Sequence, residues 1–382
     1  MIGASPHQYR ANALAAGLSS QTIQHVLAQA ERVERNGVPA ILTLRHLAHI
    51  TGADYKYLRA IVSRSEDGYT PFTIRKKTGG SRLIASPEPQ LLSVQRWIAR
   101  QVLANRPVHI CSMAYARGAS PLKCASRHIG ARWLFKFDIH DFFESISEDR
   151  VYSIFRSCGY QPLIAFELAR ICTRVHSAYA SIPPRWQSRR VHGPTEITAY
   201  SDDRLGHLPQ GAPTSPMLSN LVSEPMDDLL ASLARSQGLV YTRYSDDVVF
   251  STSDDITRRE IRDLLNDITR IFASFGHRLH RKKITIAPPG ARKLVLGLLV
   301  DGSQVRLSRE YRARLEGHVR GIETFGLAEH AASRHFASIW GMVRHIGGLI
   351  AHAKAVDGPF GDAMALRLST ALTALGWSEP SG

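Results

Sequence analysis

The feature that most constrains the fold is the segment Tyr241–Ser251, in which two runs of β-branched and aromatic residues flank the pair Asp246 and Asp247. Two such runs separated by a short polar stretch predict a β-hairpin with both carboxylates at its tip. Adjacent carboxylates repel each other unless a cation lies between them. Mg²⁺ suits this place, because it binds one or two protein carboxylates together with substrate phosphates. An Asp-Asp turn alone is more often a solvated loop, so a second signal must support the metal site.

That second signal is Asp138, at the end of the apolar run that opens the segment Arg132–Ile146. The run predicts a strand, and active-site carboxylates of sheet proteins commonly lie at strand ends. Three carboxylates on two strand ends could hold two metal ions for an in-line phosphoryl displacement. Asp138 could instead cap a helix beginning near Phe142 and Phe143, since Asp is a favoured N-cap residue. The two roles are compatible, so capping does not exclude metal binding.

Three motifs in this order resemble those of reverse transcriptases. Asp138 is followed five positions later by Phe143, the segment 208–216 reads Leu-Pro-Gln-Gly-Ala-Pro-Thr-Ser-Pro, and the segment 244–247 reads Tyr-Ser-Asp-Asp. The segment 72–87 is also similar to the family's first fingers motif. An ordered set of motifs is far more selective than any single one. The resemblance extends over roughly residues 45 to 365.

Within that superfamily the chain most resembles bacterial retron reverse transcriptases and their defence-associated relatives. The segment 124–128 reads Cys-Ala-Ser-Arg-His where retron enzymes usually have Asn-Ala-x-x-His. The segment 295–300, similar to the last palm strand, opens with Val-Leu-Gly in place of Val-Thr-Gly. Each retron signature is therefore partly kept. The favoured function is an RNA-directed DNA polymerase of retron type. A non-retron defence-associated or group II intron-like reverse transcriptase is the alternative, and a catalytically silent RNA-binding scaffold ranks third.

The resemblance implies an α+β right-hand polymerase fold with fingers, palm and thumb and an antiparallel palm sheet. Residues 1–65 are predicted to form a helical N-terminal extension, 66–305 the fingers and palm, and 306–382 a helical thumb. Within the extension, residues 43–62 outline a helix-turn-helix, which we interpret as a packing hairpin more readily than as a DNA-reading module. A shift to Pro, Arg, Gly and Asp over residues 181–207 predicts an inserted loop.

The charge balance suits a nucleic-acid partner. The chain has 48 Lys and Arg against 33 Asp and Glu, a net charge of +15. A basic domain of another kind could share this balance, so charge supports the motifs without replacing them. The four cysteines, at 111, 124, 158 and 172, contain no Cys-x-x-Cys pair, which predicts free thiols. No signal peptide and no run of 18 apolar residues is present, so a cytoplasmic protein without a membrane partner is expected.

The resemblance also implies roles for single residues. Asp138, Asp246 and Asp247, with the carbonyl of Ile139, would hold two Mg²⁺ ions, and Lys283 or its neighbour Lys282 would protonate the departing pyrophosphate. Phe143 would be the steric gate against a ribose 2′-OH, with a buried core Phe as the alternative. The residues predicted to bind the deoxynucleotide are Lys76, Lys77, Arg82, Asp141, Phe142, Phe143, Gln210 and Gly211.

A further set of residues is predicted to contact nucleic acid: His128, Tyr244, Arg309, Arg312, Arg314 and Arg320. The four arginines recur at roughly helical spacing, so they could lie along a duplex, although an ordinary exposed helix face has the same pattern. The retron resemblance implies as partners a structured noncoding RNA serving as template and primer, its complementary DNA product, deoxynucleotides and an effector protein encoded nearby. Antiphage defence is the implied setting.

Overall fold

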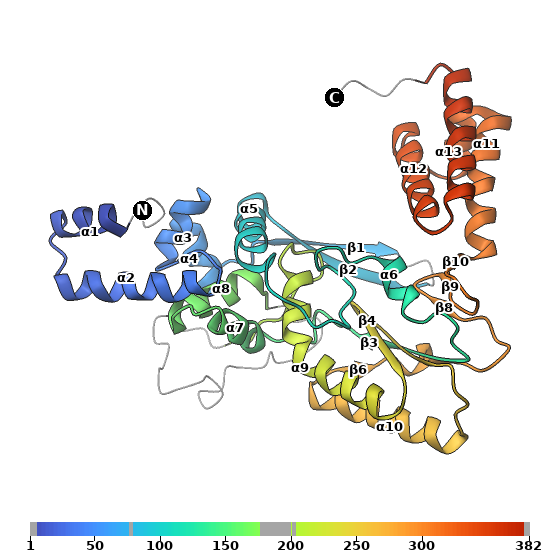
Figure 1. Cartoon of the computed structure of the whole chain (residues 1–382). Coiled ribbons are helices and arrows are strands. Elements are labelled where there is room, and N and C mark those ends of the chain that lie inside the picture. Colours follow the sequence, from blue (N-terminus) through green and yellow to red (C-terminus); the bar gives the residue numbers. More distant parts are fainter. Residues whose placement is uncertain (1–5, 76–78, 176–199, 201–203, 378–382) are drawn as a thin grey trace.

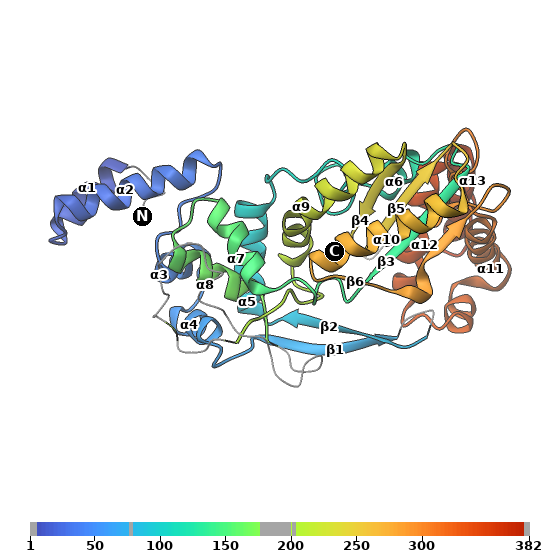
Figure 2. The ribbon, with the colours of Figure 1, turned by 90° about the horizontal axis from the view of Figure 1, so that it is seen from below.

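The computed structural model describes residues 6–75, 79–175, 200 and 204–377. Two views at right angles place the N-terminal helices and the C-terminal helices at opposite ends of the molecule, with the sheets between them (Figures 1 and 2). The predicted residues Lys76 and Lys77 and most of the predicted loop 181–207 lie outside the described residues. No described helix is long and apolar enough to cross a membrane, and the four cysteines are free thiols.

The N-terminal region is helical, as predicted. Its helices are α1 (Pro6–Ala15), α2 (Ser20–Arg35), α3 (Leu44–Thr51) and α4 (Tyr55–Ser63). Thr43 caps the start of α3, and Gly52 ends it in the left-handed conformation with φ 69°. The apolar faces of α3 and α4 are buried in the main core through Leu47, Leu58 and Ile61. The two helices of the helix-turn-helix outline therefore pack on the main core, as the packing-hairpin interpretation requires.

A long hairpin follows, and we call it the fingers hairpin. It pairs β1 (Tyr69–Arg75) with β2 (Ser81–Pro87) in antiparallel register, from Tyr69 opposite Pro87 to Arg75 opposite Ser81. Beyond it the chain continues through α5 (Pro89–Ile98), a π-helical turn at Ala99–Leu103, and α6 (Pro121–Ser126).

The central sheet, which we call the palm sheet, is antiparallel. Its strands are β3 (Trp133–His140), β4 (Val240–Tyr244), β5 (Asp247–Thr252), β6 (Arg278–Leu279) and β7 (Thr285–Ala287). They run in the order β4-β5-β3-β6, with β7 also paired to β3. Alternation along the strands sends Phe135, Phe137 and Phe250 into the main core. The residues between them, Lys136 and Asp138, are only partly buried and lie on the opposite face.

Four helices pack on or beside the palm sheet: α7 (Glu148–Ser157), α8 (Pro162–Cys172), α9 (Ser215–Ser236) and α10 (Arg258–Ser274). Helix α9 packs against β4 and α10 against β6, whereas α7 and α8 pack against each other and α7 also contacts α9. Residues 141–146 form turns, and α7 begins only at Glu148, so the helix-cap alternative for Asp138 is wrong. The strand instead runs on to His140, because its backbone pairs with β5 and β6.

The C-terminal region packs around a second core. A three-stranded sheet of β8 (Leu294–Val295), β9 (Leu298–Leu299) and β10 (Arg306–Leu307) leads into α11 (Arg309–Ser333), α12 (Ile339–Val356) and α13 (Gly358–Ala374). We call α11–α13 the thumb helices. The prediction of one palm strand over 295–300 is wrong: Leu296 and Gly297 adopt positive φ angles of 50° and 81° and turn the chain back into a hairpin.

Candidate active site

A cleft of about 510 Å³ opens between the fingers hairpin and the turn of the β4–β5 hairpin. Segments far apart in the sequence line it: Gly79 and Ser81–Leu83, Tyr115, Asp138–Glu144, Gln210, Ser245 and Asp246, His280 and Lys283. The cleft therefore collects most of the residues that the sequence predicted for catalysis and nucleotide binding.

The predicted β4–β5 hairpin is present, with a two-residue turn. Tyr244 pairs with Asp247, which leaves Ser245 and Asp246 to make the turn. Ser245 adopts a positive φ of 60°, a strained conformation for a residue with a side chain. Two contacts hold the turn: the Tyr115 hydroxyl donates to Ser245 Oγ at 2.9 Å, and the Ile139 amide donates to the Asp246 carbonyl at 3.1 Å.

The three predicted carboxylates meet at this edge of the palm sheet. Asp138 lies directly opposite Asp247 in the β3–β5 register, so their side chains share one face, and Asp246 is in the adjoining turn. Burial raises the pKa of both Asp246 and Asp247, and the neighbouring carboxylates raise it further. The site therefore favours any cation that can offset the crowded negative charge.

Lys283 supplies positive charge to Asp138. Its Nζ lies 2.8 and 2.9 Å from the two carboxylate oxygens of Asp138. The His280 amide donates to the Asp138 carbonyl at 2.8 Å, which holds the Lys283 segment against β3. Across the described ranges, no three His, Cys, Asp or Glu side chains are grouped closely enough to hold a metal ion. The oxygen donors fit a divalent ion, but Asp138 would have to exchange the Lys283 ammonium for it.

The predicted nucleotide-binding residues with described positions surround the same cleft. Arg82 enters from the fingers hairpin, whereas Asp141 and Phe143 follow β3. Phe142 also borders the cleft, but its side chain is buried in the main core. Gln210 lines the cleft and its carbonyl accepts from the Ala85 amide at 2.8 Å.

Gly211 allows this close approach of the loop to β2. It has a φ of 116°, and a Cβ placed there would lie 2.8 Å from the Ile84 Cγ2 atom. Gly211 therefore allows the backbone to pass close to β2 beside Gln210.

The position of His128 contradicts the prediction that this residue contacts nucleic acid. Its ring is 1% exposed and lies between Ser251 Oγ and Thr242 Oγ1, each 2.7 Å from a ring nitrogen. Burial lowers the His128 pKa to about 4, so the ring is neutral at physiological pH. A direct contact with nucleic acid is excluded by this burial. The residue instead joins the α6 region to strands β4 and β5.

The other predicted nucleic-acid residues differ in accessibility. Arg309, Arg314 and Arg320 are exposed along α11. Arg312 instead forms an ion pair with Asp357 and stacks over the Phe360 ring at 4.5 Å, so it joins thumb helices to each other. Tyr244 is partly buried and packs against the second core.

The sequence profile described as "Reverse transcriptase (RNA-dependent DNA polymerase)" matches residues 74–298, more than half of the 382 residues. The chain belongs to this family. The predicted right-hand α+β fold with an antiparallel palm sheet and the predicted RNA-directed DNA polymerase, a nucleotidyltransferase, are confirmed.

Curated relatives of this reverse transcriptase are retron enzymes. The Retron Ec86 reverse transcriptase of Escherichia coli is 28% identical over 293 residues, covering 76% of this chain and 81% of that protein. The Retron Mx162 reverse transcriptase of Myxococcus xanthus is 30% identical over 284 residues, covering 72% of this chain and 56% of that protein. The Retron Mx65 reverse transcriptase of the same organism is 29% identical over 351 residues, covering 88% of this chain and 74% of that protein. The retron-type resemblance is thereby confirmed.

Among solved structures, a telomerase from Candida albicans in complex with a TWJ fragment of telomeric RNA is 13% identical. The superposition has a TM-score of 0.46 and covers 82% of this chain and 56% of the telomerase chain.

Sequence reasoning missed a buried polar network behind the β4–β5 turn of this reverse transcriptase. Arg243 is 0% exposed, donates to both carboxylate oxygens of Asp227 at 2.8 and 2.6 Å, and reaches the Ser245 carbonyl at 3.3 Å. Tyr241 also donates to Asp227, at 2.6 Å. A signal was present, since alternation along β4 places Arg243 on the same inward face as Tyr241. A charged residue at an inward strand position predicts a buried partner.

Proposed function

We propose that this reverse transcriptase extends DNA by two-metal catalysis at the edge formed by Asp138, Asp246 and Asp247. The observation that carries the proposal is the register that sets Asp138 opposite Asp247, with Asp246 in the adjoining turn. Asp138 and Asp246 line the cleft. The carbonyl of Ile139 would add a further oxygen ligand. Two Mg²⁺ ions, when bound, would lower the pKa of the primer hydroxyl and neutralise the triphosphate.

The residues around the carboxylates have roles that follow from their places in the cleft. Arg82, with Lys76 and Lys77 from the same hairpin, would hold the triphosphate, because cations form strong hydrogen bonds to phosphate oxygens. Asp141 and the Phe142 backbone would border the bound nucleotide. Lys283 already lies in the cleft beside Asp138, and once released from that carboxylate it can donate a proton to pyrophosphate.

Phe143 is proposed as the gate that excludes the ribose 2′-OH. Its ring is half-buried against the main core and packs near Phe142 with centroids 5.5 Å apart, so it is held firmly at the cleft wall. Phe143→Val is expected to reduce discrimination against ribonucleotides roughly tenfold or more, because the steric clash is removed. Primer extension with each nucleotide type measures the ratio. Phe272→Leu, a change in a buried ring of α10 that does not line the cleft, serves as the control and should retain discrimination.

An unchanged ratio in a folded Phe143→Val protein would assign the gate to another residue.

The proposed template is a structured noncoding RNA of which part is copied into DNA from an internal 2′-OH. The support is the set of curated relatives, which are named as retron reverse transcriptases. The exposed Arg309, Arg314 and Arg320 would add salt-sensitive phosphate contacts, while shape and loop contacts would select the RNA. An effector protein encoded nearby and a role in antiphage defence complete the proposal.

Copurified nucleic acid tests this template assignment. We expect one defined RNA joined to a short DNA through a 2′,5′ linkage. Sequencing before and after treatment with a debranching enzyme would reveal the joint. A heterogeneous RNA pool, or long DNA without a branch, would instead favour the non-retron defence-associated or group II intron-like alternative.

A further inference from the structure

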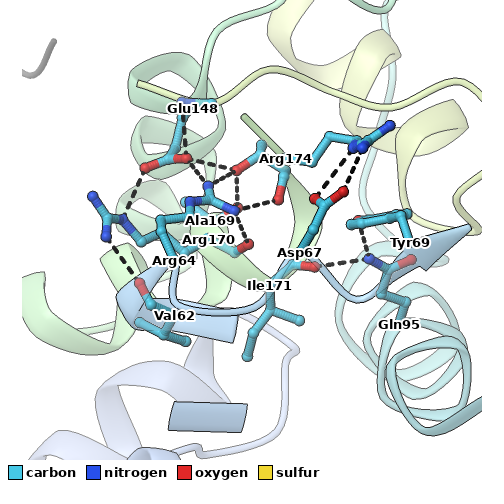
Figure 3. A network of polar contacts seen from close by, with 12 residues as sticks. Val62, Arg64, Asp67, Tyr69, Gln95, Glu148, Ala169, Arg170, Ile171 and Arg174 are labelled. Carbon is cyan, nitrogen blue, oxygen red and sulfur yellow. Dashed lines mark hydrogen bonds and ion pairs between the residues drawn. The ribbon is translucent and has the colours of Figure 1, made fainter. Parts of the chain in front are cut away.

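A buried cluster of charged residues lies behind the cleft, around Glu148 in the first turn of α7. Glu148 and Arg170 are both 0% exposed. Figure 3 shows Arg64 and Arg170 converging on the Glu148 carboxylate. The Arg170 Nε atom lies 3.2 Å from Glu148 Oε1, and Arg64 pairs with the other oxygen. One carboxylate thus pairs with two guanidinium groups in the interior, where a buried charge is costly unless it is paired and hydrogen-bonded.

Hydrogen bonds to backbone carbonyls complete this cluster, which we call the Glu148 cluster. Arg64 Nη1 donates to the Thr173 carbonyl at 2.8 Å, and Arg170 Nη1 donates to the Val62 carbonyl at 2.9 Å. The Thr173 hydroxyl lies 2.8 Å from both Glu148 Oε2 and the Ala169 carbonyl, and it can donate its single proton to one of them. The cluster therefore joins the ends of α4 and α8 to the start of α7.

Glu148 also clamps the chain just before the Pro-Gln-Gly loop. Its amide donates to the Gly206 carbonyl at 2.8 Å, and the Gly206 amide donates back to Glu148 Oε2 at 3.1 Å. The fit is tight: a Cβ at Gly206 would lie 2.4 Å from Glu148 Oε2 and 2.7 Å from Arg64 Nη2. Any side chain at Gly206 must therefore shift either the loop or the side-chain ends of the cluster.

The contacts between Glu148 and Gly206, which we call the clamp, lie between two segments that line the proposed nucleotide site. The segment with Gln210 forms one wall of the cleft, and the segment with Phe143 forms the other. On one side, Leu208 donates to the Ile146 carbonyl at 3.0 Å, and the chain then reaches Gln210 in the cleft. On the other side, the Ile146 amide donates to the Phe143 carbonyl at 3.1 Å. The Glu148 cluster thus lies where the segments that carry Gln210 and Phe143 are joined by hydrogen bonds.

The fingers hairpin is tied to the same place. Arg174 forms an ion pair with Asp67, just before β1, and exchanges two 3.0 Å backbone hydrogen bonds with His207. Gln95 bridges the Tyr69 hydroxyl of β1, at 2.6 Å, and the Ile171 carbonyl of α8, at 2.7 Å. Figure 3 also draws the Arg174–Asp67 ion pair and the hydrogen bonds of Gln95. Together with the Arg174–His207 pairing, these contacts connect α8 and the Gly206 segment to the base of the hairpin that bears Arg82.

We propose that Glu148 is a positioning residue for nucleotide selection, which sets the Gln210 wall of the cleft relative to the Phe143 wall. This inference rests on the proposed roles of Gln210 and Phe143. A shift of one wall against the other should weaken nucleotide binding and loosen sugar discrimination together. Binding of the RNA, through dispersed phosphate contacts elsewhere, should change little.

Two substitutions test the clamp without removing the buried carboxylate. Gly206→Ala should raise the KM for deoxynucleotides roughly tenfold, since displacements near 1 Å carry large costs at such sites. The kcat should stay within about twofold, the signature of lost binding common to ground and transition states. Thr173→Val, which removes the hydroxyl at Glu148, should act in the same direction, and Thr173→Ser should restore wild-type values. Discrimination against ribonucleotides should fall in Gly206→Ala and Thr173→Val only.

Gly321→Ala is the matched control, because a Cβ there would lie 2.3 Å from the His330 ring within the thumb helices. It disturbs buried packing to a similar degree but away from the cleft, so KM and sugar discrimination should remain unchanged. Thermal melts and RNA-binding measurements on every variant establish that each one is folded. If Gly206→Ala does not fold, the comparison of Thr173→Val with Thr173→Ser tests the positioning role instead.

Wild-type KM and discrimination in folded Gly206→Ala or, failing that, Thr173→Val would overturn the positioning role. An equal change in Gly321→Ala would also overturn it, by showing a general effect of destabilisation. Gln210→Ala and Phe143→Val separate this outcome from failure of the proposed function. If those two variants alter KM or discrimination and the cluster variants do not, only the positioning role fails. If they alter neither, the proposed nucleotide site itself is wrong.

Discussion

Replacing Asp246 and Asp247 together by asparagine is expected to abolish DNA synthesis while leaving RNA binding largely intact. Neutral amides cannot offset divalent charge as carboxylates do, so the loss should be at least about 10³-fold in primer extension. RNA affinity depends on dispersed phosphate contacts and should change little. Asp254→Asn with Asp255→Asn makes the same charge change on exposed residues just beyond β5 and serves as the control. Full extension by the Asp246 and Asp247 double variant would disprove the catalytic assignment.

The same double variant has an expected effect on stability, whose sign follows from the raised pKa values. Burial raises the pKa of both carboxyls in the folded state, so the folded protein holds these protons more tightly than the unfolded chain. Their stabilising contribution is present below the unfolded pKa and is lost as pH rises through the folded pKa. Without divalent ions at neutral pH, the double variant should therefore melt at or above the wild-type temperature. Added Mg²⁺ should raise the melting temperature of the wild type only.

Asp227→Ala is expected to cause the largest loss of stability among the single substitutions considered. The Arg243 guanidinium would be left in the core without its carboxylate, and breaking a buried pair in this way costs about 3–5 kcal/mol. The side chains of both partners are 0% exposed in the folded protein. Because Arg243 also reaches the Ser245 carbonyl at 3.3 Å, the β4–β5 turn should loosen, and DNA synthesis should fall if the proposed catalytic site is correct. Urea denaturation measures the stability, and primer extension the activity.

Asp228→Ala provides the neighbouring control. The Asp228 side chain is 66% exposed and lies 3.5 Å from His109, so its removal should change the stability by less than about 0.5 kcal/mol. Combining Asp227→Ala with Arg243→Met should recover part of the lost stability, because the unpaired charge is then absent. Equal stability of the Asp227→Ala and Asp228→Ala proteins would show that the buried pair contributes nothing.

Local sequence pattern determined the elements that carry the three proposed catalytic carboxylates. Two runs of β-branched and aromatic residues around a short polar stretch predicted the β4–β5 hairpin with Asp246 and Asp247 at its tip, and an apolar run predicted the strand that carries Asp138. These predictions held because side-chain alternation in a strand and the chemistry of a short turn are set by neighbours within a few residues. The order of the three motifs then identified the family before any tertiary contact was known.

Tertiary packing determined the partners and the burial of several residues, which local sequence patterns do not predict. The pairing of Asp138 with Lys283 joins residues that are 145 positions apart, and the support of Ser245 by Tyr115 spans 130 positions. His128 looked like a nucleic-acid contact, yet packing placed it between Thr242 and Ser251 and left it neutral. Glu148 was not singled out from the sequence, and only the fold encloses it with Arg64 and Arg170. Burial and the partners of a buried charge depend on segments distant in sequence, so only the assembled fold determines them.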